Sequence, residues 1–77
     1  MHRDRVDLAR KADEVLTDLD DDAHEHVLAL IDSVAEDPDA WPVAGTWELG
    51  DEFSDRAWIT YIAHVDGIEI IDVGWAG

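Results

Sequence analysis

Acidic residues at alternate positions are the first group whose types and spacing could carry chemistry. Asp18, Asp20 and Asp22 are spaced like the first ligands of an EF-hand calcium loop. Alanine occupies the sixth and twelfth positions, as Ala23 and Ala29, where such a loop needs a glycine and a bidentate glutamate. We therefore interpret the acidic run as a turn that leads into a helix, and we predict no metal site and no cofactor.

Histidines and serines form the second group. His64 and Glu69 could act as an acid–base pair, but a histidine and a glutamate on neighbouring strands are more often a cross-strand polar pair. His24 and His26 lie two residues apart in a predicted helix, so they point to different faces and cannot bind one ion together. Ser54 lies in a predicted loop with no base beside it, and the sequence therefore indicates no nucleophilic site.

The charge balance restricts the partners. The 77 residues include 5 basic and 20 acidic side chains, a net charge of −15, and no cysteine. Such a chain repels phosphate backbones, because nucleic-acid binding depends on lysine and arginine. We interpret the acidity as a solvated surface, with an acidic nucleic-acid-mimic inhibitor as the alternative. The charged start of the chain and the lack of a run of about 20 apolar residues favour a cytoplasmic protein without membrane contact.

Two helices are predicted in the first half of the chain. Apolar residues recur at three- and four-residue spacing over 4–19 and again over 23–36. Asp4 is a candidate N-cap for the first helix, and Asp22 with Glu25 resembles a capping box for the second. Pro38 marks the end of the second helix. The short connection predicts a helical hairpin.

Three strands are predicted in the second half, at about 45–49, 57–65 and 68–75. The last two are joined by Asp66-Gly67, a strong signal for a type I′ hairpin. This register places Val65 opposite Ile68. The fold class is therefore α+β, a single domain over 1–77 in which a helical hairpin packs on one face of a small antiparallel sheet.

Alternation along the hairpin separates two largely apolar faces. The first predicted face carries Ile59, Tyr61, Ala63, Val65, Ile68 and Ile70. The second carries Trp58, Thr60, Ile62, His64, Glu69, Ile71, Val73 and Trp75. Only one face can pack on the helices.

Several segments resemble the RelE/ParE toxin family of toxin–antitoxin systems. They are the acidic-capped stretch from Leu19 to Ile31, Glu36-Asp-Pro, Tyr61-Ile-Ala-His-Val-Asp-Gly and Ile70-Ile-Asp-Val-Gly, within Ala12 to Trp75. The resemblance implies a RelE-like fold, ribosome-dependent mRNA cleavage and a protein antitoxin as partner. It also implies that the tyrosine face packs on the helices, which leaves the second face as the working face.

The chain departs from the family where the chemistry is carried. The family usually opens with a strand, whereas this chain opens with a helical pattern. Trp58 occupies the family's arginine position before Tyr61, and Trp75 and Ala76 occupy its terminal His-Arg positions. Since cleavage needs basic groups to stabilise developing charge, we predict that it has been lost. The alternative is an active toxin with an atypical site made of Arg56, Tyr61 and His64.

The working face is then predicted to bind protein. Exposed apolar patches usually mark interfaces, and tryptophan is a frequent hot-spot residue. The predicted interface consists of Trp58, Ile62, Ile71, Val73 and Trp75. Its partner is either an antitoxin-like protein or a second copy of the chain in a homodimer. The alternative is that Trp41, Trp47 or their loop folds over this face as a second core layer.

Overall fold

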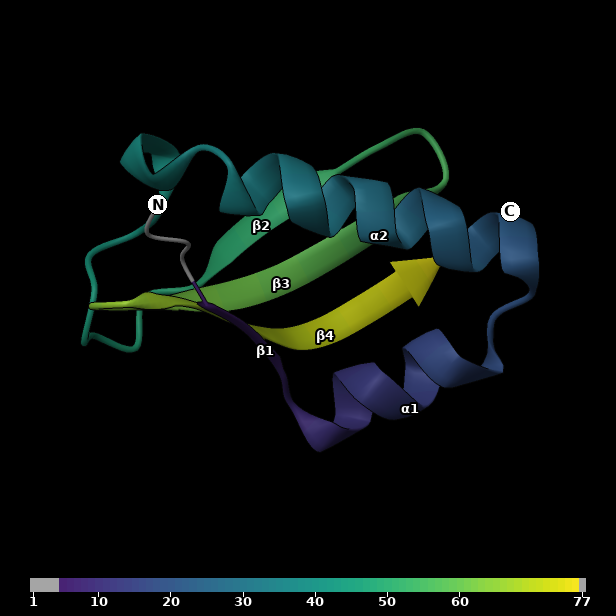
Figure 1. Ribbon diagram of the computed structural model, residues 1–77, viewed down its shortest axis with the longest axis horizontal. Coiled ribbons are helices and arrows are strands. Elements are labelled where there is room, and N and C mark those ends of the chain that lie inside the picture. Colours follow the sequence, from purple (N-terminus) through teal and green to yellow (C-terminus); the bar gives the residue numbers. More distant parts are fainter. Residues whose placement is uncertain (1–4, 77) are drawn as a thin grey trace.

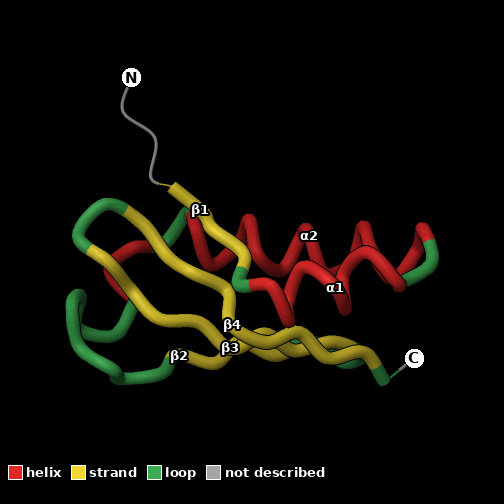
Figure 2. Tube along the Cα trace, turned by 90° about the horizontal axis from the view of Figure 1, so that it is seen from below, coloured by secondary structure: helices red, strands yellow, loops and turns green. Residues whose placement is uncertain are grey.

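The protein is a two-layer α+β domain in which two helices pack on one face of a four-stranded mixed sheet (Figures 1 and 2). The computed structural model describes residues 5–76. The strand order is β1-β4-β3-β2. The elements are β1 (Arg5–Leu8), α1 (Arg10–Asp18), α2 (Asp21–Ala35), a 3₁₀ turn η1 (Pro38–Ala40), β2 (Gly50–Phe53), β3 (Ala57–His64) and β4 (Gly67–Trp75). The predicted α+β class, with helices on one face of a small sheet, is confirmed.

The chain begins with a strand where a helix was predicted. β1 pairs in parallel with β4, with Arg5 opposite Gly67 and Leu8 opposite Ile70. The prediction was wrong over residues 5–9 because two apolar residues in a short alternation fit a helical stripe equally well, and only the distant partner strand decides. Gly67 permits the close approach, since a Cβ there would overlap the carbonyl oxygen of Arg5. Asp4, the candidate N-cap, lies outside the described residues.

The second helix is held at both ends by side chains. The Asp20 carboxylate accepts a hydrogen bond from the Ala23 N–H at 2.9 Å, so Asp20 is the N-cap and the predicted capping box at Asp22 begins too late. At the other end, the Trp41 indole N–H donates to the Val34 carbonyl at 2.7 Å, and the Asp37 N–H donates to the same carbonyl at 3.2 Å, so this carbonyl of the last turn is satisfied. Trp41 therefore packs against the helical layer and does not extend the sheet.

The first of the three predicted strands lies farther along the chain than expected. Residues 45–49 are a loop, and β2 follows at Gly50–Phe53. Gly45 has a φ of +79°, a left-handed conformation that interrupts an extended run. Pairing instead begins at Gly50, where the missing side chain makes room for the Tyr61 ring. The sequence of β2 is polar because it forms one edge of the sheet.

The predicted β-hairpin is present with a different turn. Val65 and Asp66 form the turn, and Gly67 is already in β4. Gly45 is the only residue with positive φ in the part of the chain described, so the turn is not type I′. Ala63 therefore faces Ile68, two residues from the predicted pairing, and Val65 is 94% exposed in the turn rather than in the core.

A β-bulge divides the hairpin into two registers. Tyr61 pairs with Ile70, but the adjacent Thr60 pairs with Asp72, which leaves Ile71 as an extra residue in β4. Because side chains alternate with a period of two, the extra residue reverses which face the rest of β4 presents. The core between the sheet and the helices contains Ala12, Leu16, Val27, Ile31, Val34, Ala57, Ile59, Tyr61, Ile68, Ile70 and Val73.

Candidate protein-binding face

The side of the sheet turned away from α1 and α2, called the open face below, carries the candidate site. Figure 2 shows both helices on the opposite side of the strands. Following the observed registers, the open face is formed by Arg5, Asp7, Asp51, Phe53, Trp58, Thr60, Ile62, His64, Glu69, Asp72 and Gly74, with Ile71 at the bulge. Neither helix in residues 5–76 is long and apolar enough to cross a bilayer.

Three of the five predicted interface residues lie on or beside this face. They are Trp58, Ile62 and Ile71, although Ile62 is largely buried. Val73 and Trp75 were assigned to the open face incorrectly, because the bulge at Ile71 turns both toward the helices.

The ring environment of Trp75 agrees with this placement. Its indole meets the His26 ring of α2 edge-on, with the ring centroids 5.4 Å apart. Trp75 is thus half-buried against the helical layer and contributes to the core. A two-fold interface centred on both Trp58 and Trp75 is excluded by this geometry, since the two side chains lie on opposite faces.

An aromatic pair occupies one end of the open face. Trp58 and Phe53 are cross-strand partners, 39% and 68% exposed. The Trp58 indole lies over Gly74, because a Cβ on that glycine would overlap the ring. An aromatic ring that covers a neighbouring glycine stabilises the strand pair and fixes the ring's position. The face therefore presents a positioned indole beside a largely solvated phenyl ring.

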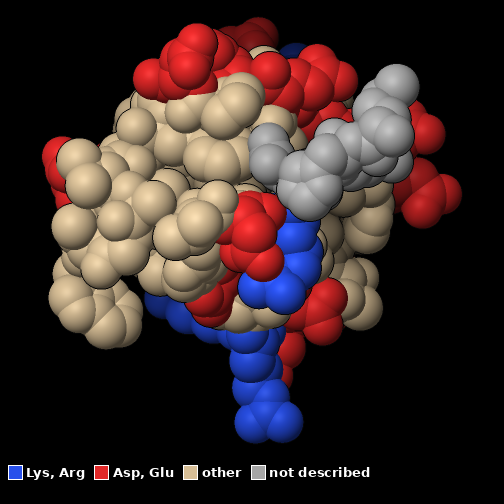
Figure 3. Space-filling view, turned by 60° about the vertical axis from the view of Figure 1, so that its left-hand side comes forward, with Lys and Arg blue, Asp and Glu red and all other residues tan. Residues whose placement is uncertain are grey.

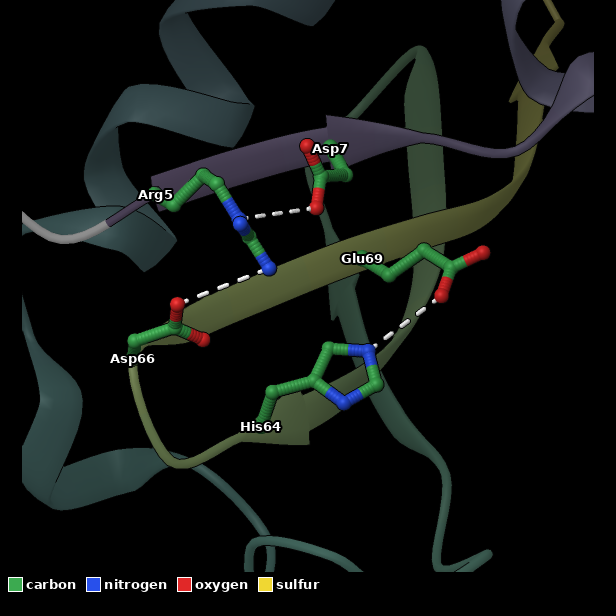
Figure 4. A network of polar contacts seen from close by, with 5 residues as sticks. All are labelled: Arg5, Asp7, His64, Asp66 and Glu69. Carbon is green, nitrogen blue, oxygen red and sulfur yellow. Dashed lines mark hydrogen bonds and ion pairs between the residues drawn. The ribbon is translucent and has the colours of Figure 1, made fainter.

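Polar pairs occupy the opposite end (Figure 4). Arg5 lies between two carboxylates, with Nε 3.1 Å from Asp7 and a terminal nitrogen 3.5 Å from Asp66. His64 Nε2 lies 3.2 Å from a Glu69 carboxylate oxygen, a polar contact that runs diagonally between the strands, because Glu69 pairs with Ile62 and His64 with Gly67. Exposed pairs of this kind contribute little to stability. They do leave this end of the face with its acidic groups already partnered.

The middle of the face has one polar contact and one small pocket. The Thr60 hydroxyl donates to the Asp51 carboxylate at 3.0 Å. Next to it, the loop before β2 approaches the end of β3, where the Gly45 N–H donates to the Ala63 carbonyl at 3.1 Å. A pocket of about 140 Å³ lies there, lined by Gly45, Thr46, Trp47, Ile62 and His64. The loop thus covers Ile62 in part, while Trp47 itself remains 88% exposed.

The three residues of the alternative catalytic site do not meet. Tyr61 is buried on the helix side of the sheet, whereas His64 lies on the open face. Arg56 is exposed just before β3 and His64 ends that strand, so about 25 Å of extended chain separates them. Burial raises the pKa of Tyr61, and the carboxylates of Glu52, Asp37 and Asp51 raise it further. A raised pKa keeps the phenol protonated and unsuited to act as a base at neutral pH.

The structure brings together one serine and one histidine that the sequence did not connect. Ser54 Oγ lies 2.7 Å from Nε2 of His26. The same oxygen also accepts from the N–H groups of Arg56 and Ala57, at 3.4 and 3.1 Å. The lone pairs of the Ser54 hydroxyl are therefore engaged within the β2–β3 turn. Its contact with His26 joins that turn to α2. The 28-residue separation leaves no local sequence signal.

Among residues 5–76, no three histidine, aspartate or glutamate side chains are arranged to hold a metal ion, and Asp20 serves as a helix cap. A scan against protein-family models and searches of curated proteins and of solved structures each found no match to this chain.

Proposed function

We propose that the protein is a RelE/ParE-like toxin-type module that acts by binding another protein and no longer cleaves mRNA. The observation that carries the proposal is the open face, where Trp58 and Phe53 stand exposed on a sheet that no described helix covers on that side. Large exposed apolar groups on a folded surface usually serve an interface. Tryptophan is the residue most often found to dominate such interfaces.

The opening strand supports the family resemblance. The family usually begins with a strand, and β1 supplies one that the sequence pattern did not reveal. Two helices and three further strands follow in the order expected from the resemblance. Trp58 still occupies the arginine position on the open face, and Thr60, the next residue of β3 on that face, lies between Asp51 and Asp72 on the neighbouring strands. A face with this chemistry favours protein over RNA, since carboxylates repel phosphate.

An antitoxin-like protein fits this face better than a second copy of the chain. Each copy carries a net charge of −15, and the open face contributes the carboxylates of Asp7, Asp51, Glu69 and Asp72 against one arginine, Arg5. Two such faces packed on each other would place carboxylates against carboxylates, which costs association free energy. The proposed partner is therefore a different protein, in the cytoplasm, with no nucleic acid or membrane.

A second candidate function is an acidic nucleic-acid-mimic inhibitor. The outer surfaces of the helices favour it, because exposed carboxylates follow one another along both of them. They are Asp13, Glu14, Asp18, Asp21, Asp22, Glu25 and Asp32. This function would use the helical layer and depend strongly on salt, whereas the proposed one uses the open face.

Co-expression tests the proposal. The chain is produced with the protein encoded by the adjacent reading frame, and the mixture is analysed by sedimentation. We expect a one-to-one complex that Phe53→Asp abolishes. Leu28→Asp is the matched control, because it places the same charge on a 40% exposed apolar site of α2. A chain that sediments alone would overturn the toxin-type proposal. Ribosome-dependent cleavage in a primer-extension assay would favour the active toxin instead.

A further inference from the structure

The free edge of β2 offers backbone groups at two positions. In an antiparallel pair, hydrogen-bonded residue pairs alternate with pairs that are not bonded. The Ser54 N–H donates to the Ala57 carbonyl at 2.8 Å, so Ser54 belongs to a bonded pair and Glu52 to the next. The N–H and C=O groups of Asp51 and Phe53 therefore point away from β3. No backbone bond joins either residue to another segment within residues 5–76.

The same two residues place their side chains on the open face. Asp51 is cross-strand to Thr60, and Phe53 is cross-strand to Trp58. A strand added at this edge would thus set alternate side chains beside a carboxylate and beside two aromatic rings. The pocket next to Trp47 lies farther along the same line, beyond the start of β2. Backbone pairing, a charge and an apolar platform coincide in one strip of surface.

Charge identifies the occupant. The segment from Trp41 to Asp55 contains four carboxylates and no lysine or arginine. Arg5 and Lys11 form their ion pairs with Asp7, Asp66 and Asp72, toward β1 and β4. Seen from the loop end, neutral side chains form a broad surface with Asp and Glu along its upper rim, and the Lys and Arg in the foreground lie below it, beside acidic neighbours (Figure 3). Arg56, exposed in the turn after β2, is the nearest cation along the chain, so the β2 side carries four carboxylates against one arginine and is net negative.

A second copy of the chain fits this edge poorly. Antiparallel pairing of two β2 edges would bring Asp51 and Glu52 of one chain against the same pair of the other. Like charges directly opposite each other on neighbouring strands are destabilising. Charged side chains on an edge strand in fact protect a sheet from pairing with its own copies. They attract a strand of opposite charge.

We propose that β2 binds an extended arginine-rich segment of a partner protein by strand addition. The segment pairs with the backbone of Asp51 and Phe53, sets one guanidinium against the Asp51 carboxylate, and stacks the next same-face guanidinium on Phe53 and Trp58. Arginine suits both positions, because its planar guanidinium binds carboxylates and stacks on aromatic rings. The inference rests on the proposed protein-binding function and names the chemistry of the partner.

A labelled peptide tests the inference without the natural partner. The probe is a fluorescein-labelled octapeptide of alternating arginine and valine, and its binding to the full chain is followed by fluorescence anisotropy. The first control peptide carries glutamate in place of arginine. The second keeps arginine but has N-methyl groups on alternate backbone amides, which removes strand pairing and retains the charge. We expect the unmodified arginine peptide to bind at least about tenfold more tightly than either control.

Matched variants locate the site. Asp51→Lys is expected to weaken the arginine peptide at least about tenfold, because a carboxylate contact is replaced by repulsion. Glu25→Lys makes the same charge change on the exposed surface of α2 and is expected to weaken it less than about threefold. Asp51→Asn keeps the side chain's size and an oxygen for the Thr60 hydroxyl, so it separates the charge from any folding defect.

Each other outcome overturns the inference. Equal binding of the N-methylated peptide would mean charge attraction without strand addition. Equal losses for Asp51→Lys and Glu25→Lys would place the peptide on the general acidic surface. The co-expressed partner distinguishes this failure from failure of the proposed function. Suppose that the complex is lost in Phe53→Asp but is unchanged in Asp51→Lys and in high salt. The proposed protein-binding function would then stand, and the inference that the partner adds an arginine-rich strand would be wrong.

Discussion

The two faces of the sheet are built from the same strands but solve different problems. On the helix side, Ile59, Ile68 and Ile70 are fully buried and no charged side chain joins the core cluster. On the open face, carboxylates lie among aromatic and aliphatic groups. The polar contacts of these carboxylates with Arg5 and Thr60 are solvent-exposed. The helix side therefore determines stability, whereas the open face is free to vary in chemistry. Substitutions on the two faces should separate stability from binding.

The largest stability difference is expected between two isoleucines. Ile59→Ala removes a side chain that is 0% exposed between the sheet and the helices, and it should lower the free energy of unfolding by about 2–5 kcal/mol. Ile71→Ala, at the partly exposed bulge, should cost less than about 1 kcal/mol. Urea unfolding measures both. If Ile59→Ala prevents folding, Ile59→Val provides the smaller step, and equal losses at the two sites would contradict the contrast.

Substitutions at two glycines should differ in their cost, because one glycine lies against backbone and the other against a side chain. Gly67→Ala would force a methyl group into the Arg5 backbone, so we expect a loss of about 1–3 kcal/mol and faster amide hydrogen exchange in β1. The nearest atoms to a methyl group in Gly74→Ala belong to the Trp58 side chain, which can shift at a lower cost than backbone. This substitution should cost less and leave the exchange of β1 unchanged. Faster exchange in β1 for both variants would show that the two contacts are not independent.

Alkaline pH probes the helix side through its phenol. The pKa of Tyr61 is raised above its ordinary 10.0, first by burial and then by Glu52. The folded state thus holds the proton more tightly than the unfolded state. The stabilisation is fully present below pH 10.0 and is lost as the pH rises through the raised value. Tyr61 is the only tyrosine, so tyrosinate absorbance reports it directly. Titration at or below the ordinary value would contradict the buried placement.

The smallest effect is expected from the ion pairs of the open face. Arg5→Met removes the ion pairs with Asp7 and Asp66, and all three side chains are at least half solvent-exposed. Such pairs contribute less than about 1 kcal/mol, and salt screens them. Thermal unfolding at low and high salt measures this. A large loss that salt does not reduce would mean that Arg5 holds β1 by packing.

Local patterns predicted the parts of the fold that depend on local physics. The periodicity of Val27, Ile31 and Val34 located α2, and Pro38 marked its end. Alternation grouped Ile59, Tyr61, Ala63, Ile68 and Ile70 on one face, and the family resemblance implied that this face packs on the helices, where all five are buried. The signals were sufficient because each face was set by residues within one strand.

The missed parts depend on partners far along the chain. β1 is a strand only because β4 lies beside it, and no residue type announced the bulge at Ile71. That one residue moved Val73 and Trp75 from the predicted interface into the helical layer. The structure places Trp58, Ile62 and Ile71 on or beside the candidate face, as predicted, whereas Asp51 and Phe53 were missed because β2 was placed five residues too early.

The pairing of the first strand with the last has a kinetic consequence. β3 and β4 are joined by a two-residue turn, whereas β1 can pair only after β4 has formed, since Arg5 pairs with the distant Gly67. Closing that long loop costs entropy before any contact compensates for it, so β1 should dock after the main folding barrier has been crossed. Substitutions in Val6 should then accelerate unfolding and leave the refolding rate nearly unchanged. In stopped-flow experiments only the unfolding arm of the chevron would move, which would make the opening strand a latch that governs how long the folded state lasts.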